Sequence, residues 1–277
     1  MQHDREEEGK TVIMQEKQAD SVSAPSLLLA LTEPMRAIFE LGTIPMAAPL
    51  LSLAPRGDGH PVLILPGFMT SDRSTGVLRR FLSRMGYQPF TWDLGRNLGP
   101  KAIGYQGERL IERLDEIYEK TGRKVSLVGW SLGGMMARQL SRRRPDIVRQ
   151  VITLGSPIVG NPRATNAWRA YQAMTGQRLE DPGAQEQLRE SELPPPVPST
   201  AIYTKEDGIV AWQNCMEPAD ALTDNIQVHG SHCGLGVNPV VLFAVADRLA
   251  QEEGTWKPFD RSSLIRQFAY PSSGHSH

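Results

Sequence analysis

The chain has 277 residues, 40% of them hydrophobic, which is enough for one large domain or two small ones with a substantial core. Its 30 Lys and Arg residues nearly balance its 31 Asp and Glu residues, so charge offers no reason to expect a nucleic acid as partner. The two cysteines, Cys215 and Cys233, are too few for a disulfide framework or for a zinc site by themselves.

Residues 1–23 are polar and charged and include the run Glu6-Glu7-Glu8, a composition typical of a disordered tail. They lack the basic start and apolar core of a secretory signal. No stretch of the chain approaches the roughly 18 apolar residues that a membrane span needs. We therefore expect a cytoplasmic protein.

Residues 24–59 are rich in Leu, Ile and Met, and prolines at 25, 34, 45 and 49 predict several short helical pieces. We expect these pieces to pack on the flank of the domain. The alternative is an amphipathic anchor that associates weakly with a membrane surface. Few Lys or Arg side chains are available to bind lipid head groups, and this favours packing.

From residue 60 onward, short apolar runs alternate with amphipathic ones. We expect strands at 60–65, 87–92, 124–128, 148–154, 200–204 and 225–229, and helices at 75–85, 103–119, 134–140 and 239–250. This alternation predicts an α/β fold over 60–252, with a mostly parallel twisted sheet and helices on both faces. Residues 253–277 are expected to form an irregular C-terminal tail.

Periodicity is lost between the strands at 148–154 and 200–204. A connection of this length in a compact domain usually has a function, often as a lid, so we expect a helical cap at about 157–197. Trp168, Tyr171 and Met174 lie at helical spacing within it, and we expect them to form the core of the cap. The alternative is that some of them face the pocket.

The run Gly129-Trp130-Ser131-Leu132-Gly133 matches the G-x-S-x-G pattern of a nucleophile elbow. An apolar run precedes it and good helix formers follow it, which predicts a strand that turns directly into a helix. The residue at the apex is held in a strained backbone conformation, so its neighbours two positions away must be small, as Gly129 and Gly133 are. Ser131 is therefore the candidate nucleophile.

A serine hydroxyl needs a base to take its proton, and an imidazole needs a carboxylate to orient it. Of the six histidines, only His229 and His232 follow a late strand, and His232 lies in a glycine-rich loop that can reach over the sheet edge. We expect His232 to be the base, with His229 as the alternative.

The candidate acid is Asp207, which follows the strand at 200–204 and precedes Gly208. The alternatives are Glu206, Asp220 and Asp224. With Asp207 the order along the chain is nucleophile, acid, base.

Two backbone amides are candidates for an oxyanion hole. Leu132 follows the nucleophile at the start of a helix, where the helix dipole is positive. Phe68 follows Pro66-Gly67 at the end of the first strand, and a glycine there lets the chain turn and point the next amide inward.

An arginine cluster follows the elbow, with members at 138, 142, 143, 144 and 149. We interpret it as a solvated helix end. A patch that binds an acidic ligand is the alternative.

The chain resembles the α/β-hydrolase superfamily, and within it the bacterial lipase- and esterase-like serine hydrolases. The resemblance rests on L-P-G-F at 65–68, G-W-S-L-G at 129–133, D-G-I-V at 207–210 and G-S-H-C-G-L-G at 230–236. It implies a catalytic triad of Ser131, Asp207 and His232 with no metal or organic cofactor. Proline occupies position 66, where many lipases have histidine, and the H-G-G-G run is missing, so the substrate stays open.

The function predicted from these motifs is hydrolysis of small-molecule or lipid-like carboxylic esters through an acyl-enzyme. Acyl transfer or thioester cleavage would use the same triad, and a catalytically silent binding protein on this fold is a further alternative. The oligomeric state is left open. If the acid and base loops touch, Cys215 and Cys233 lie near each other, and we expect two reduced thiols rather than a bridge.

Overall fold

The computed structural model describes residues 22–161, 163–176 and 190–272. Residues 1–21, which make up most of the expected tail, and residues 162 and 177–189 of the expected cap lie outside the described residues. The boundaries expected for tail, cap and hydrolase domain stay predictions.

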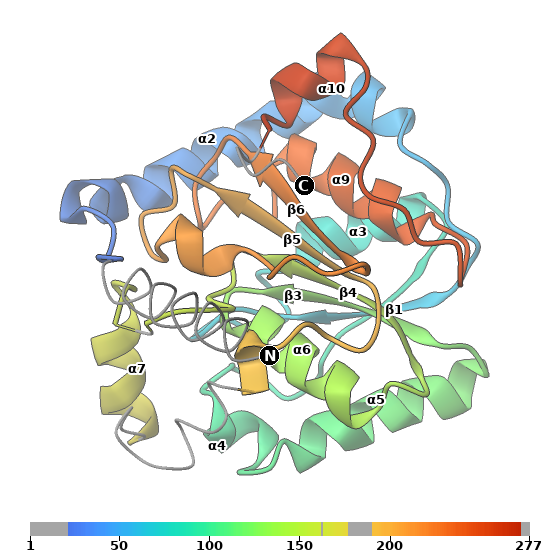
Figure 1. Cartoon of the computed structure of the whole chain (residues 1–277), viewed down its shortest axis with the longest axis horizontal. Helices are drawn as coiled ribbons and strands as arrows, with labels where there is room; N and C mark the ends of the chain where they lie inside the picture. Colours follow the sequence, from blue (N-terminus) through green and yellow to red (C-terminus); the bar gives the residue numbers. More distant parts are fainter. Residues whose placement is uncertain (1–21, 162, 177–189, 273–277) are drawn as a thin grey trace, which may run out of the picture.

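A six-stranded, wholly parallel sheet forms the centre of the molecule, in the order β2-β1-β3-β4-β5-β6 (Figure 1). Its strands are β1 Pro61–Leu65, β2 Gln88–Phe90, β3 Val125–Trp130, β4 Val148–Leu154, β5 Ser199–Thr204 and β6 Thr223–Val228. All but the edge strand β2 are almost wholly buried, as the apolar runs predict for a sheet covered on both sides.

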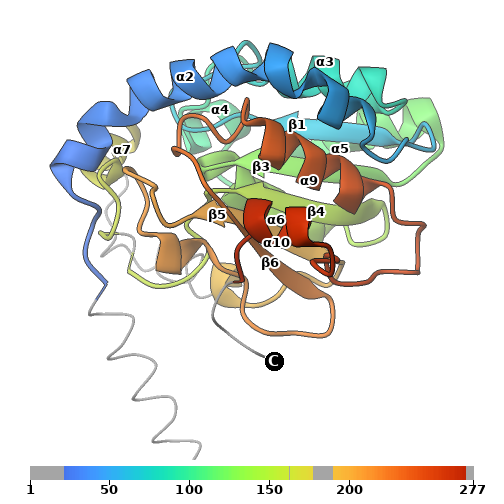
Figure 2. The same cartoon turned by 90° about the horizontal axis from the view of Figure 1, so that it is seen from above.

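Helices cover both faces of the sheet, which confirms the predicted architecture (Figures 1 and 2). On one face α3 (Gly76–Arg84) and α9 (Pro239–Leu249) pack with Ile64, Val128 and Ile152 of the sheet. On the other, α5 (Glu108–Thr121) and α6 (Leu132–Arg143) pack with alternate residues of the same strands, among them Leu63 and Leu127. Two separate apolar cores therefore hold the strand ends in place.

Two expected elements differ in detail. The helix expected at 103–119 is two helices, α4 (Pro100–Ile103) and α5, because the glycines between them break the run. Gly104 and Gly107 have φ of 88° and 73°, a conformation that a helix interior excludes. The C-terminal tail is also more ordered than expected: it contains α10 (Leu264–Ala269), and Phe259 and Tyr270 are buried against each other.

The N-terminal apolar segment forms one helix, α2 (Leu27–Ser52), so the prediction of short pieces is wrong. Pro34, Pro45 and Pro49 all lie inside the helix and all are exposed. A proline removes one hydrogen bond of the helix, but on the outer side water can bind the freed carbonyl. Contacts with the rest of the protein then outweigh the local cost.

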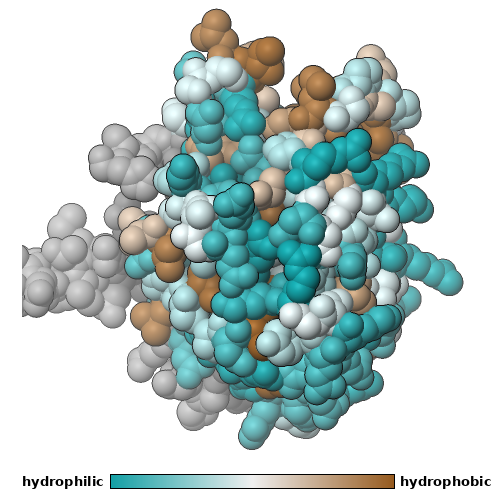
Figure 3. Space-filling model, turned by 90° about the vertical axis from the view of Figure 1, so that its right-hand side faces the viewer, coloured by the Kyte–Doolittle hydropathy of each residue, from teal (hydrophilic) through white to brown (hydrophobic). Residues whose placement is uncertain are grey.

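The helix α2 lies along α9 on the flank of the domain, as expected, but with an unexpected face inward (Figure 2). Its buried residues are Glu33, Glu40 and Leu51, with Ile44 and Ala47 partly buried beside them. Most of its large apolar side chains are exposed: Leu27, Leu28, Leu31, Met35, Ile38, Phe39, Leu41, Met46 and Leu50. Figure 3 shows hydrophobic surface at the top of the molecule, the side where Figure 1 places α2 and α10. The segment therefore packs on the flank as expected, but two carboxylates and few apolar side chains make up its buried face.

The interpretation of the arginine cluster as a solvated helix end is wrong for its first and last members. Arg149 lies in β4, is buried and pairs with Asp58 at 2.9 Å. Arg138 is fully buried and pairs with the buried carboxylate of Glu217. It also donates to the carbonyls of Ser191 and Leu193, both at 2.8 Å. Arg138 thus ties the helix behind the elbow to two distant loops.

Within the described ranges no helix is both long and apolar enough to cross a membrane.

Candidate active site

Ser131 stands at the point where β3 ends and α6 begins. Its backbone has φ of 52° and ψ of −120°, one of three positive φ values among the described non-glycine residues. Such a conformation costs about 1–3 kcal/mol and persists only where the surroundings impose it. The strained turn predicted from the G-x-S-x-G run is present.

The glycines around Ser131 have a steric reason to be there. A Cβ atom on Gly129 would lie 2.4 Å from the Gly133 carbonyl oxygen, and one on Gly133 would lie 2.4 Å from the Leu65 carbonyl oxygen. Both contacts are with backbone, which cannot move aside. The elbow is therefore packed directly against the end of β1.

The segment after β1 brings Phe68 to the same corner. A Cβ atom on Gly67 would be 3.5 Å from the Ser131 Cβ, so this turn and the elbow are in contact. Asn97 holds the turn from the other side. Its side-chain amide donates to the Pro66 carbonyl at 2.8 Å, and its main-chain carbonyl accepts from the Met69 amide at 2.8 Å. Among the described residues, nothing accepts a hydrogen bond from the Phe68 or Leu132 amide.

Asp207 and His232 form a buried pair, although 25 residues separate them. Asp207 follows β5, His232 follows β6, and Asp207 Oδ2 lies 2.6 Å from His232 Nδ1. The other oxygen of Asp207 accepts from the amides of Ile209 at 2.8 Å and Val210 at 2.7 Å. Asp207 is thus held so that it can fix the tautomer of the imidazole.

The alternative residues lie elsewhere. His229 is exposed and pairs with exposed Glu206 at 2.8 Å. Asp224 accepts from the Phe259 amide at 2.6 Å, and Asp220 accepts from the Leu222 amide within its own turn. The structure brings none of these carboxylates to His232.

Two contacts place the Asp207–His232 pair beside Ser131. Trp130, directly before Ser131, donates from its indole to the His232 carbonyl at 3.1 Å. The Ser131 amide donates to the Leu154 carbonyl, and the next residue, Gly155, is so close to the pair that a Cβ on it would lie 3.0 Å from His232 Nδ1. In the described part of the chain, the Ser131 hydroxyl and the His232 ring are not hydrogen-bonded to each other, an arrangement common in sites without substrate.

The surroundings raise the pKa of His232. Burial by itself lowers it, but the charge of Asp207, the hydrogen bond to Asp207 and the charge of Glu33 together outweigh burial. An imidazole with a raised pKa is a stronger base, which suits it to accept a proton from a hydroxyl.

Ser131 opens into a pocket with a volume of about 200 Å³. Its walls are largely apolar and include Phe68, Met135, Trp168 and Tyr171. Trp168 and Tyr171 belong to α7 (Trp168–Thr175), the described helix of the expected cap, and the rings of Tyr171 and Phe68 meet edge to face at 5.4 Å. Trp168 and Tyr171 thus line the pocket, which is the alternative that the sequence left open for them.

Both cysteines are free thiols, as expected. Cys215 is wholly buried, and burial raises its pKa well above the usual range. Burial and the charge of Glu33 raise the pKa of Cys233 to about 12. In the ranges described, no group of three or more His, Cys, Asp or Glu side chains is arranged to hold a metal ion.

Sequence reasoning missed four residues that shape this site: Trp130, Asn97, Glu33 and Glu40. Trp130 has a local signal, because it is the variable position of the elbow motif, but its partner is 102 residues away. The two glutamates are about 200 residues from the loop that they contact, and nothing in the sequence near them indicates it.

The chain is similar to several known proteins. Residues 105–189 match the family described as PGAP1-like alpha/beta domain. A triacylglycerol lipase of Pseudarthrobacter phenanthrenivorans is 26% identical over 109 residues, which are 37% of this chain and 34% of the lipase. The chain therefore spans about a third of the length of that relative.

Two solved structures share the fold. Aspergillus fumigatus lipase B superimposes with a TM-score of 0.53 at 16% identity, over 70% of this chain and 53% of the lipase. Bacillus licheniformis lipase BlEst2 superimposes with a TM-score of 0.51 at 18% identity, over 72% of this chain and 95% of the lipase. The chain has the α/β-hydrolase fold.

Proposed function

We propose that the protein hydrolyses carboxylic esters with Ser131 as nucleophile, His232 as general base and Asp207 as the residue that orients His232. The observation that carries the proposal is the buried Asp207–His232 pair, which lies against the strained turn that presents Ser131 to the pocket. The similarity to a triacylglycerol lipase supports an ester as substrate.

The reaction would proceed in two halves. The Ser131 oxygen attacks the ester carbonyl as His232 Nε2 takes the hydroxyl proton, and the carbonyl electron pair moves onto oxygen. The amides of Phe68 and Leu132 would bind that oxyanion, helped by the positive end of α6. The carbonyl re-forms, the alcohol leaves with the proton from His232, and the acyl-enzyme remains. Water then attacks it in the same way and releases the acid.

The pocket supports an apolar acyl or alcohol part. Met135 and Met136 of α6 line the same pocket as Ser131, together with Trp168 and Tyr171 of α7. Methionine and aromatic side chains adapt to flexible apolar groups.

Substitution of the nucleophile tests the proposal. Ser131→Ala should lower kcat on p-nitrophenyl esters by roughly 10⁴- to 10⁶-fold, the range known for triads. Its unfolding midpoint should be unchanged, because the hydroxyl makes no hydrogen bond among the described residues. A fluorophosphonate should label wild type once per chain, and the variant not at all.

A panel of p-nitrophenyl esters of increasing chain length would identify the preferred acyl group. Hydrolysis by Ser131→Ala at the wild-type rate, or labelling at another residue, would refute the proposal.

A further inference from the structure

The helix α2 presents two carboxylates to the loops that carry Asp207 and His232. Glu33 and Glu40 are seven residues apart, so they lie on one side of the helix, two turns from each other. Glu33 is 1% exposed and Glu40 is 9% exposed, whereas most large apolar residues of the helix are exposed. Burial of a carboxylate costs desolvation free energy, so hydrogen bonds or ion pairs must offset that cost for Glu33 and Glu40.

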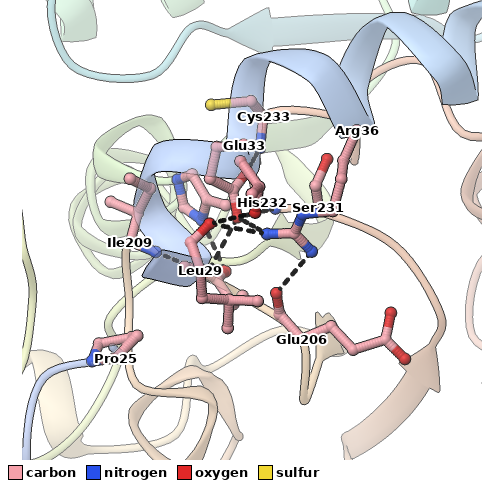
Figure 4. A network of polar contacts seen from close by, with 12 residues as sticks. Pro25, Leu29, Glu33, Arg36, Glu206, Ile209, Ser231, His232 and Cys233 are labelled. Atoms are coloured by element: carbon pink, nitrogen blue, oxygen red, sulfur yellow. Dashed lines mark hydrogen bonds and ion pairs between the residues drawn. The ribbon is translucent and has the colours of Figure 1, made fainter. Parts of the chain in front are cut away.

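Glu33 bridges the acid loop and the base loop (Figure 4). Its Oε1 accepts from the amide of Gly208, which follows Asp207, at 2.7 Å, and from the amide of His232 at 3.1 Å. Its Oε2 accepts from the amide of Cys233 at 2.7 Å. One side chain therefore binds the backbone on both sides of the Asp207–His232 hydrogen bond.

Arg36 completes the bridge from the next turn of the helix. It donates to Glu33 at 2.7 Å and to the carbonyl of Glu206, directly before Asp207, at 2.9 Å. A Cβ atom on Gly208 would lie 2.6 Å from the Leu29 carbonyl oxygen, so α2 touches the acid loop itself.

Glu40 binds the base loop alone. It accepts from the amide and the hydroxyl of Ser231, both at 2.7 Å, and from the side chain of Asn238 at 2.9 Å. A Cβ on Gly230 or Gly234 would lie 2.9 Å or 2.2 Å from Glu40 Oε2. The glycines of this loop thus make room for the carboxylate.

We propose that Glu33 is a positioning residue that holds Asp207 and His232 in register for the reaction of Ser131. The negative charge of Glu33 also favours the protonated form of His232. The inference rests on the proposed function. Glu40 anchors the base loop but lacks the contact with the acid loop. The two carboxylates therefore differ in a way that an experiment can separate.

The charges near His232 come from four segments. Asp207 is in direct contact, with Glu206 one residue away on the same loop. The helix α2 contributes Glu33, Arg36 and Glu40. The loop that carries His232 contributes His229 and Cys233, and the short helix Trp212–Cys215 contributes the buried thiol of Cys215. Of these, Asp207 and Glu33 raise the pKa of His232 against the effect of burial.

The test compares Glu33→Gln with Glu40→Gln. Each change removes one carboxylate of α2 at nearly constant size. Glu33→Gln should lower kcat on p-nitrophenyl acetate by roughly 10- to 100-fold, the scale of small misplacements remote from the chemistry, with little change in KM. The acid limb of its kcat/KM profile should move to lower pH, because a positive His232 loses a favourable charge. Glu40→Gln should lower kcat less and keep the wild-type acid limb.

A wild-type acid limb in Glu33→Gln, or an equal shift in both variants, would overturn the inference. If Glu33→Gln does not fold, Glu33→Asp replaces it in the test, because this variant keeps the charge and shortens the side chain. Its kcat should fall while the acid limb of its kcat/KM profile stays at the wild-type pH. A wild-type kcat in Glu33→Asp would overturn the inference. Wild-type hydrolysis by Ser131→Ala would instead mean that the proposed function has failed. Loss of activity in Ser131→Ala together with a wild-type Glu33→Gln would reject the role of Glu33 alone.

Discussion

The buried pair of Arg138 and Glu217 allows a quantitative test of how the elbow helix is held. Arg138→Met replaces the guanidinium by an apolar side chain of similar length. It leaves the Glu217 carboxylate buried without its partner, an effect that costs about 3–5 kcal/mol. The Ser191 carbonyl also loses a donor, at about 1 kcal/mol if water does not replace it, whereas the Leu193 carbonyl keeps a donor in Arg142.

The expected loss in unfolding free energy is therefore about 4–6 kcal/mol, a large part of the roughly 5–15 kcal/mol of a typical domain. The double variant Arg138→Met/Glu217→Gln removes both charges. The side-chain oxygen at position 217 can still accept the hydrogen bond from the Ser199 hydroxyl, which is 2.5 Å long in the wild type. This double variant should recover at least half of the lost stability. Most of the loss in Arg138→Met comes from the unpaired buried charge, whereas an intact buried ion pair adds little net stability.

Urea unfolding followed by circular dichroism measures these differences from the midpoint and the slope. The control is Arg142→Met, one turn along α6, whose side chain is only partly buried and should cost less than about 1 kcal/mol. A loss below about 1 kcal/mol for Arg138→Met, or a double variant no more stable than it, would refute the reasoning.

Four further predictions concern the site and its surroundings. His232→Ala should reduce kcat as much as Ser131→Ala, with the double variant little worse, whereas His229→Ala should stay active; the reverse order in a p-nitrophenyl ester assay would move the base to His229. Because the pKa of His232 is raised, the acid limb of kcat/KM should lie above the roughly 6.5 of a free imidazole, and a limb below it would contradict the assignment. The same shift makes protonated His232 favour the folded state, so the stability difference between wild type and His232→Ala should fall as pH rises through the folded pKa. Thiol titration should find Cys215 and Cys233 both free after denaturation without reductant, and slow to react before it; two thiols that appear only after reduction would show a bridge.

The sequence alone was sufficient for the sheet, the elbow and the candidate site residues. Each of these leaves a local signature: buried parallel strands are short apolar runs, and a strained apex needs glycines two positions away. Asp207 and His232 could be chosen because each follows a strand, and parallel strands bring their carboxyl ends to one edge of the sheet. The break between α4 and α5 also had a local cause, in Gly104 and Gly107, which the apolar periodicity concealed.

Only the tertiary structure decided the role of α2. Its prolines predict short pieces, yet it is one helix. Glu33 and Glu40 face inward because amides 175 to 200 residues away donate to them. Arg138 is buried for a similar reason, since its partner Glu217 comes from a loop 79 residues further on. A buried charge is stable only where distant groups pair with it, and the sequence around the charge carries no record of those groups.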